Sequence, residues 1–253
     1  MNYDLQKAGM WKRISAALLD GILLVVLITG AFFALSELFH YSEHNQAMAD
    51  IYDRYAAEYG ISFDITEEEL AALPADKLAI YEAAANAMNK DEEAIYVYNM
   101  IINISMAIIT LGTLIAYVVL ELVVPLIFGN GQTLGKKVFG LAVMRTDGVK
   151  IKNTQLFIRA ILGKYTVETM VPLLLLLMMS TGSIGMFGPI LLLFFAAVQL
   201  GLLLFNQYRA CIHDYLSATV VVDYASQLIF ETSMDLLKHQ QKVAAEKADR
   251  ADY

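Results

Sequence analysis

The stretch RISAALLDGILLVVLITG, residues 13–30, decides how the rest of the chain is interpreted. It is apolar over most of its length, yet it begins with Arg13 and carries Asp20 well inside. A helix that crosses about 30 Å of hydrocarbon needs roughly 20 apolar residues, because each residue rises about 1.5 Å. The apolar run continues to Leu35, so it predicts a first membrane span that contains a carboxylate.

The composition of the whole chain agrees with a membrane protein. Of 253 residues, 58% are hydrophobic and 17% are charged, and the mean hydropathy is +0.53. Soluble domains are typically about 45–50% apolar and about 25% charged. The first residues lack the pattern of a cleavable signal peptide, so we expect the first span to be retained. The lone cysteine, Cys211, excludes an internal disulfide bond.

Four apolar runs are long enough to cross a bilayer as helices, in which every backbone amide is bonded internally. They cover residues 14–35, 100–128, 165–180 with a more polar extension before it, and 189–205. The predicted fold class is therefore an all-α membrane protein. It has four transmembrane helices, an external helical insert and a small cytoplasmic β-element.

Lysine and arginine residues are distributed unevenly between these runs. Residues 36–98 contain three of them beside fourteen acidic residues, whereas residues 129–164 contain seven beside one acid, Asp147. Because positively charged loops stay on the cytoplasmic side, we expect a multi-pass protein of the cell membrane with both termini in the cytoplasm. The predicted regions are the N-terminus with the first span (1–35), an external acidic cap (36–98), the second span (99–128), a cytoplasmic loop (129–164), the third and fourth spans (165–206) and a cytoplasmic C-terminal region (207–253).

The acidic segment 36–98 has the spacing of amphipathic helices, with Ala, Leu, Ile and Tyr three or four residues apart. Thr66 is followed three residues later by Glu69, which is the pattern of a capping box, so one helix should begin there. These features predict a small helical cap. A solvated spacer without a partner and a surface that gathers ligands or docks a partner both remain open.

The loop of residues 129–164 contains a β-branched and apolar stretch, Val138 to Met144, then the turn dipeptide Asp147-Gly148 and a following VKI. This order predicts a β-hairpin. A valine-rich stretch, residues 218–223, is a further strand candidate that could pair with it. The tail 226–250 has the pattern of an amphipathic helix that lies on the membrane or on the sheet, or contacts another subunit.

Two enzymatic interpretations do not fit the pattern. The Gly-rich start of the loop departs from the phosphate-loop consensus, because Asn130 replaces the first glycine and Lys137 replaces the serine or threonine. Cys211, His213 and Asp214 are too close in sequence to align as nucleophile, base and orienting acid. We therefore expect no enzymatic activity, no cofactor, no resident metal centre and no nucleic-acid partner.

Several polar residues of the predicted spans lie near the cytoplasmic ends of those spans. Asp20 lies seven residues after Arg13, and Glu121 lies seven residues before the end of the second run, so both carboxylates fall about 10 Å from the same surface. Lys164 and Glu168 lie four residues apart at the start of the third span. A lone ionised carboxylate at the bilayer centre costs at least about 2.5–3.5 kcal/mol, so Asp20 needs a partner, water or a proton. Asp20, Glu121, Lys164 and Glu168 are thus candidates for binding an ion or substrate, and a structural polar network is the alternative.

The proximity of Asp20 and Glu121 has a chemical consequence. Two neighbouring carboxylates repel each other, so one should hold a proton near neutral pH unless a cation lies between them. Cation entry would then release a proton, which is the basis of exchange. If Lys164 reaches the pair, its charge favours the structural network instead.

Three motifs together resemble the RDD family of membrane proteins: AGMWKRISAALLDGILL near the start, GQTLGKKVFGLAVMRTDG in the central loop and RACIHDYLSATVVVD after the last span. Arg13 and Asp20 match the arginine and the first aspartate of the family name, and Asp214 matches the second aspartate. Ser217 and Ala218 depart from the family, in which a glycine-containing turn is common at this point. The resemblance implies a transporter with an undefined ligand, and proton-coupled sodium exchange is suggested for some members.

The motif match also makes Arg13 and Asp214 candidates for a structural clasp between the first span and the cytoplasmic sheet. Either charge would be costly if it were left unpaired near the membrane. A snorkelling Arg13 at the headgroup level is the simpler alternative.

Two functions from different classes remain open. The first is a transporter or cation/proton exchanger of the RDD type that uses these carboxylates. Four spans make a thin wall for a complete pathway, so we expect such a transporter to be a homo-oligomer. The second is a non-transporting scaffold or accessory subunit that docks partners through the cap, the sheet and the tail. The lipid bilayer is a partner in both cases, and a small cation or a proton is the ligand in the first.

Overall fold

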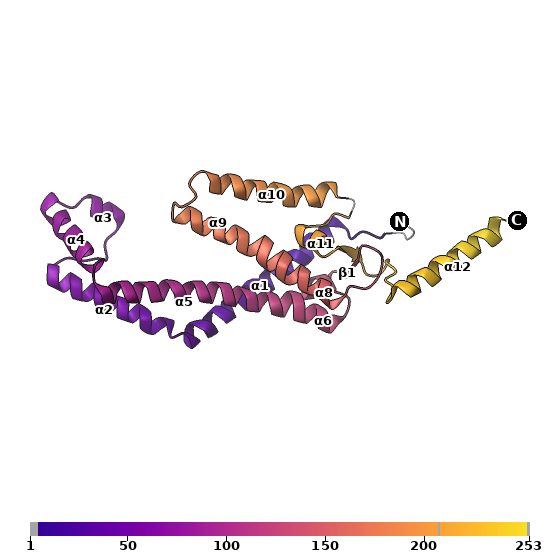
Figure 1. Ribbon diagram of the computed structural model, residues 1–253, viewed down its shortest axis with the longest axis horizontal. Coiled ribbons are helices and arrows are strands. Elements are labelled where there is room, and N and C mark those ends of the chain that lie inside the picture. Colours follow the sequence, from indigo (N-terminus) through magenta and orange to yellow (C-terminus); the bar gives the residue numbers. More distant parts are fainter. Residues whose placement is uncertain (1–4, 207, 252–253) are drawn as a thin grey trace. The chain divides into compact units, whose positions relative to one another are not determined.

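The computed structural model describes residues 5–206 and 208–251 of the chain (Figure 1). The described chain is mostly helical, with one two-stranded sheet. Its elements in chain order are α1 (Met10–Leu38), α2 (Tyr41–Tyr59), α3 (Glu67–Ala71), α4 (Ala75–Met88), α5 (Glu92–Tyr117), the π-helical segment η1 (Val118–Val123), α6 (Val124–Phe128), α7 (Leu134–Val138), β1 (Leu141–Arg145), α8 (Asn153–Phe157), the π-helical segment η2 (Ile158–Met170), α9 (Val171–Ser180), α10 (Phe187–Phe205), α11 (Ile212–Leu216), β2 (Thr219–Asp223) and α12 (Ser233–Ala251).

Four helices of the described chain are long and apolar enough to cross a membrane. They are α1, the continuous helix Glu92–Phe128 made of α5, η1 and α6, the continuous helix Asn153–Ser180 made of α8, η2 and α9, and α10. In each of these helices, no more than 33% of the most apolar 18-residue segment is buried inside the protein. Their apolar surface therefore faces outward, as expected of helices surrounded by lipid, and the predicted fold class is confirmed.

The third of these helices begins at Asn153 instead of near residue 165. Its first turn is supported by Gln155, whose side-chain oxygen accepts from the backbone N–H of Lys152 over 3.3 Å. The following thirteen residues are π-helical, a conformation that is rare and found mostly in short pieces at functional sites. Because the helix begins earlier, it includes Arg159, which was predicted to lie in the preceding loop, and Lys164, which was predicted to lie where the loop meets the third span.

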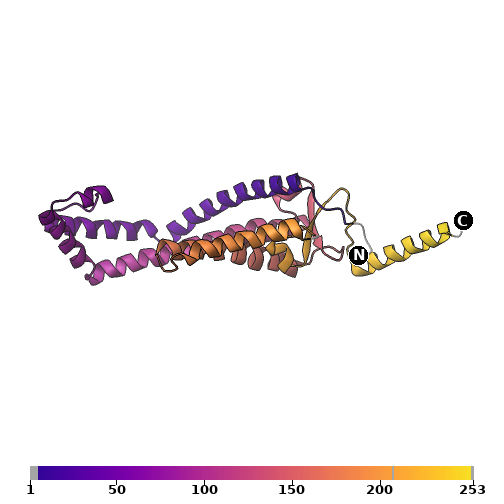
Figure 2. The ribbon, with the colours of Figure 1, turned by 90° about the horizontal axis from the view of Figure 1, so that it is seen from above.

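The fourth apolar helix, α10, lies beside α9, and both ribbon views place the two segments alongside each other (Figures 1 and 2). The connection between them contains Gly182 and Gly185, both with a left-handed backbone at φ +70° and +52°. Glycine adopts this conformation without a steric penalty, so the chain reverses direction within a few residues.

The two strands of the sheet come from distant parts of the sequence. β1 pairs with β2 in antiparallel register, with Leu141 opposite Asp223 and Arg145 opposite Thr219. The predicted participation of the valine-rich stretch is thus confirmed. The predicted hairpin is wrong in its extent, because Val149 and Lys150 contribute only isolated bridges and Val138 belongs to α7.

Both faces of the sheet are buried, which explains the continuous apolar runs Leu141–Met144 and Val220–Val222 in its strands. One face, formed by Ala142, Met144, Val220 and Val222, packs with Leu5, Tyr208 and Ile229. The other face, formed by Leu141, Val143 and Val221, packs with Ala8, Ala16, Ile151 and Leu156. Ala16 belongs to α1, so the sheet contributes to anchoring the beginning of the first apolar helix.

The chain divides into two compact units, one of residues 1–28 and 113–253 and one of residues 29–112. The second unit contains α2, α3 and α4, and its core is formed by Ile51, Met88, Ala94 and Val97. The predicted capping box is confirmed: Thr66 Oγ1 accepts from the N–H of Glu69, and the Glu69 carboxylate accepts from the N–H of Thr66.

The predicted helix in the C-terminal tail is also present. It corresponds to α12, which begins after Thr232. The hydroxyl of Thr232 accepts from the backbone N–H of Asp235, and the Asp235 carboxylate accepts from the N–H of Thr232. This reciprocal pairing satisfies two of the amides that a helix leaves open at its start.

Candidate functional site

Asp20, the carboxylate inside the first apolar helix, is bound by the segment that precedes β1. The hydroxyl of Thr133, the N-cap residue of α7, donates to Asp20 Oδ2 over 2.5 Å. The backbone N–H of Gly135 donates to Asp20 Oδ1 over 2.8 Å. A Cβ atom at position 135 would lie 2.9 Å from Asp20 Cγ. Because glycine has no side chain, α7 approaches α1 closely enough to bind both oxygens of this carboxylate.

The ammonium of Lys136 lies between Asp20 and Glu121. Its Nζ is 3.7 Å from Asp20 Oδ2 and 3.9 Å from Glu121 Oε2, and it donates to Thr133 Oγ1 over 3.0 Å. The Lys136 side chain is only 9% exposed. Burial lowers the pKa of Lys136 to about 8, and the carboxylate of Glu121 opposes this shift. The two carboxylates therefore have a cation from the protein itself between them.

Lys164 reaches the same pair from η2. Its Nζ donates to Glu121 Oε1, whereas Lys136 lies nearest the other oxygen, Oε2. The hydroxyls of Tyr117 and Thr169, which belong to the same two helices, share a hydrogen bond of 2.7 Å. Glu121 and Lys164 lie in the two π-helical segments, η1 and η2. Lys164 therefore does reach the carboxylate pair, and its positive charge favours a structural polar network.

Asp214 binds Arg159 most closely. Arg159 Nη1 donates to Asp214 Oδ1 and, over 2.9 Å, to Thr219 Oγ1. The predicted clasp residue Arg13 approaches the other oxygen, with Nη2 3.5 Å from Asp214 Oδ2, and its Nη1 donates to the carbonyl of Arg209 over 2.6 Å. Burial opposes ionisation of Asp214, but the two guanidinium groups hold the pKa of its carboxyl well below the usual range.

His213 connects this ion pair to the third apolar helix. Its Nδ1 lies 2.8 Å from Glu168 Oε2, and its Nε2 lies 3.1 Å from Arg159 Nη2. Since a guanidinium can only donate, Nε2 is the acceptor and Nδ1–H donates to Glu168. Burial lowers the pKa of His213, although Asp214 opposes this shift. Gln199 of α10 also donates to Glu168, over 3.1 Å, so the Glu168 carboxylate connects η2 to α10 and, through the neutral imidazole of His213, to α11.

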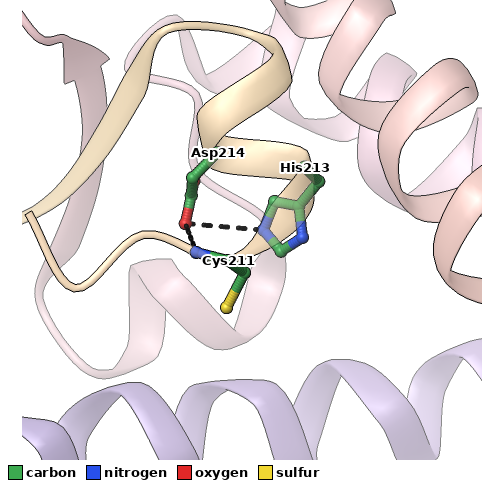
Figure 3. A group of neighbouring side chains, drawn as sticks. All are labelled: Cys211, His213 and Asp214. Carbon is green, nitrogen blue, oxygen red and sulfur yellow. Dashed lines mark hydrogen bonds and ion pairs between the residues drawn. The ribbon is translucent and has the colours of Figure 1, made fainter. Parts of the chain in front are cut away.

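Cys211, His213 and Asp214 lie together at the start of α11, with one potential ligand atom from each within 4.8 Å of the others (Figure 3). Burial raises the pKa of the Cys211 thiol to about 11, so the thiol is protonated at neutral pH. Asp214 is bound by two guanidinium groups, and both ring nitrogens of His213 have partners. A metal ion would need a thiolate and displaced cations, so these donors do not fit a metal and we assign none.

A cavity of about 360 Å³ connects these groups within the unit of residues 1–28 and 113–253. Four acidic and four basic side chains line it, so their formal charges cancel. They are Asp20, Glu121, Glu168 and Asp214 with Arg13, Lys136, Arg159 and Lys164. The remainder of the lining is largely apolar and includes Leu24 of α1 and Leu203 of α10. In the described part of the chain, no buried side-chain nitrogen or oxygen lacks a hydrogen-bond partner.

All six residues predicted for the ion site and the clasp line this cavity. Asp20 and Glu121 are separated by Lys136, and Lys164 and Glu168 bind different partners. Lys136 and Arg159 were not predicted as site residues, because in the sequence both are simply positive charges of a loop. The sequence did contain a signal for Lys136. Thr133 is a typical helix N-cap residue, and the hydroxyl of such a residue accepts from the backbone N–H three positions later, which here belongs to Lys136.

The comparisons with known proteins place this architecture in one family. The sequence model of the RDD family matches residues 7–218, a range that includes all eight acidic and basic residues that line the cavity. Comparison with curated proteins and with solved structures finds no match. The chain belongs to the RDD family, which confirms the resemblance carried by its three motifs.

Proposed function

From its membership of the RDD family and its charged cavity, we propose that this protein is a membrane transporter that exchanges a small cation for protons. One observation carries the proposal. One carboxylate oxygen of Asp20 and one of Glu121, from two apolar helices, lie on either side of a positive charge, the ammonium of Lys136. Ionisable residues within membrane helices usually mark an ion pathway.

In this proposal Asp20 and Glu121 supply the ligands for the cation. Carboxylate oxygens are hard ligands and suit hard cations such as the alkali and alkaline-earth ions. Both side chains are buried, at 8% and 5% exposure, so competition with bulk water is small. Both also line the cavity, which supplies room for a cation and its remaining water molecules.

Transport is tested with the purified full chain in proteoliposomes that contain a trapped pH-sensitive dye. An inward Na⁺ gradient should raise the internal pH, because protons leave as the cation enters. Protein-free vesicles and Asp20→Asn vesicles should show only the background leak. Absence of proton movement with Na⁺, K⁺ and Li⁺, in both gradient directions, would contradict exchange.

A second function is favoured by a different observation. The charges that line the cavity balance, and Lys164 binds Glu121 directly, as expected of a structural network in a scaffold or accessory subunit. In that case Na⁺ at millimolar concentration should not change the melting temperature of the wild-type protein in detergent. A cation that binds the folded state must raise it, so a concentration-dependent rise favours the transporter.

The proposal places both termini in the cytoplasm. It is supported by the excess of basic residues in the 129–164 segment and of acidic residues in the 36–98 segment. Single cysteines at the exposed positions Glu82 and Asp147, in a Cys211→Ala background, test it. An impermeant thiol reagent should label position 82 in intact cells and position 147 only after permeabilisation. The reverse pattern would contradict this orientation.

We also propose a homo-oligomer, because four candidate spans in one chain leave a thin wall around a pathway. Native mass spectrometry from detergent should release a dimer or a larger assembly. A monomer that retains full exchange activity would contradict this part of the proposal.

A further inference from the structure

We infer that the ammonium of Lys136 is a tethered occupant of the transport site, and that a monovalent cation binds in its place among Asp20 Oδ2, Glu121 Oε2 and Thr133 Oγ1. These oxygens lie 3.7, 3.9 and 3.0 Å from Nζ. The inference rests on the proposed function. It adds to that function a third ligand, Thr133, a competing group within the chain, Lys136, and a single positive charge for the transported cation.

The surrounding contacts orient one oxygen of each carboxylate toward this position. Asp20 Oδ1 accepts from the N–H of Gly135, and Glu121 Oε1 accepts from Lys164. Their second oxygens, Oδ2 and Oε2, face Lys136. These fixed contacts hold the two ligands in place independently of Lys136.

Thr133 completes the set with a neutral oxygen. Its hydroxyl proton is donated to Asp20 Oδ2, so a lone pair of Oγ1 is directed at Lys136 Nζ. The side chain of Thr133 is fully buried at the N-cap of α7. A cation at the ammonium position would therefore meet three oxygen ligands from three elements: α1, η1 and the N-terminus of α7.

The contacts of Lys136 are weaker than those of Lys164. Lys164 donates directly to Glu121, whereas Nζ of Lys136 lies beyond hydrogen-bond distance of both carboxylates. The Lys136 side chain also borders the cavity, into which its flexible methylene chain can withdraw. Lys136 is therefore the cation that an incoming ion displaces.

Charge balance determines the valence of that ion. Asp20 and Glu121 carry two negative charges, and Lys136 and Lys164 carry two positive charges. A monovalent cation in place of the ammonium preserves this balance, because the displaced Lys136 releases its proton and remains in the cavity as a neutral amine. A divalent cation would leave an uncompensated positive charge in a buried site, which is costly.

The experiment measures ²²Na⁺ binding to the detergent-purified full chain. Lys136→Met removes the charge without adding an oxygen ligand, and Lys136→Arg retains the charge. The neighbouring Lys137 is exposed and supplies matched controls, Lys137→Met and Lys137→Arg. Lys136→Met should bind Na⁺ at least about tenfold more tightly than the wild type, because it removes the positive charge that competes for the same three oxygens. Lys136→Arg should bind more weakly than the wild type, and both control variants should match it.

A second measurement uses the wild-type protein and needs no variant to fold. Na⁺ should increase the rate at which acetic anhydride acetylates Lys136 relative to Lys137, as read by peptide mass spectrometry, because the displaced amine enters the cavity.

Three results would overturn the inference: unchanged Na⁺ affinity in Lys136→Met, wild-type affinity in Lys136→Arg, or a Na⁺-independent acetylation ratio. Tighter binding of Ca²⁺ than of Na⁺ by Lys136→Met would overturn the monovalent assignment.

If the wild type exchanges Na⁺ for protons and Lys136→Met binds Na⁺ as the wild type does, only the role of the tethered lysine is refuted. If Lys136→Met binds Na⁺ tightly but the wild type carries no flux, the site stands and transport is refuted.

Discussion

Arg159 and Asp214, 55 residues apart in the sequence, form a buried ion pair between η2 and α11. Arg159 also donates to Thr219, the first residue of β2. One guanidinium thus joins the third apolar helix to the segment that leads into the sheet. Arg13 adds a contact from α1 to the same carboxylate, so three parts of the chain depend on Asp214.

The Arg159–Asp214 pair should dominate the stability of this region. Arg159→Met and Asp214→Asn should each lower the free energy of unfolding by about 3–5 kcal/mol, because each leaves a buried charge without its closest partner. The double variant should lose less than the sum, since both changes remove the same interaction. Chemical unfolding in detergent measures these values.

The exposed pair Arg145–Asp147 is the control for this prediction. Asp147→Asn should change the free energy of unfolding by less than about 1 kcal/mol, as is typical of surface pairs. Equal losses at the two pairs would show that burial does not determine the strength of the Arg159–Asp214 interaction.

His213 should make stability fall on the acid side of neutrality. Burial depresses its folded-state pKa, so below about pH 6.5 the unfolded chain binds a proton that the folded protein does not. The melting temperature should therefore decrease from pH 7.5 to pH 5.5.

His213→Gln tests this prediction. Glutamine retains a donor for Glu168 and an acceptor for Arg159, and the substitution should flatten the decrease in melting temperature. His239→Gln alters an exposed histidine and should leave the wild-type profile. An unchanged profile in His213→Gln would assign the effect to other groups.

Gly135 should be intolerant of a side chain because of its contact with α1. A Cβ atom there would lie 2.9 Å from the carboxylate carbon of Asp20, so Gly135→Ala should push α7 away and cost about 1–3 kcal/mol. Gly21 is the matched control, since it follows Asp20 directly and a Cβ there meets no atom within 4 Å. Gly21→Ala should be neutral or stabilising in thermal melts. Equal destabilisation by both changes would contradict the close approach at Gly135.

Ala218 has a left-handed backbone, with φ +51°, in the turn between α11 and β2. Its side chain is exposed, so Ala218→Gly removes strain without removing buried surface. The substitution should stabilise the protein by about 1 kcal/mol. Ala244→Gly, at an exposed position inside α12, should destabilise that helix by about the same amount. A loss of stability at Ala218 would contradict the turn geometry.

Much of the architecture could be predicted from local sequence pattern. Length and hydropathy identify the four apolar helices, because the bilayer thickness dictates how many apolar residues a span needs. The pairing of β1 with β2 followed from two stretches of β-branched and apolar residues. The length of the hairpin was overestimated, because Val149 bridges to Phe230, Lys150 alone bridges to Met144, and neither residue extends the sheet.

The partners inside the cavity could not be predicted in the same way. Arg159 and Lys164 lie in a π-helical segment, where the 3.6-residue period that identifies a buried face does not hold. Lys136 lies in a short helix whose burial depends on the approach of α1, which is a tertiary contact. Lys136 and Arg159 were counted only as topology signals, since basic residues next to a span usually have that role, whereas Lys164 was also predicted as a site residue.

The most direct test of the cation site is saturation binding of ²²Na⁺ to the purified wild type, Asp20→Asn and Glu121→Gln. Asp147→Asn and Glu231→Gln, at exposed acidic residues, serve as matched controls. We predict saturable Na⁺ binding by the wild type and by both controls, and a loss of affinity of at least about tenfold in Asp20→Asn and in Glu121→Gln, because each removes a charged ligand. Folded Asp20→Asn and Glu121→Gln proteins that bind Na⁺ as the wild type does, or a wild type that binds none, would contradict the account.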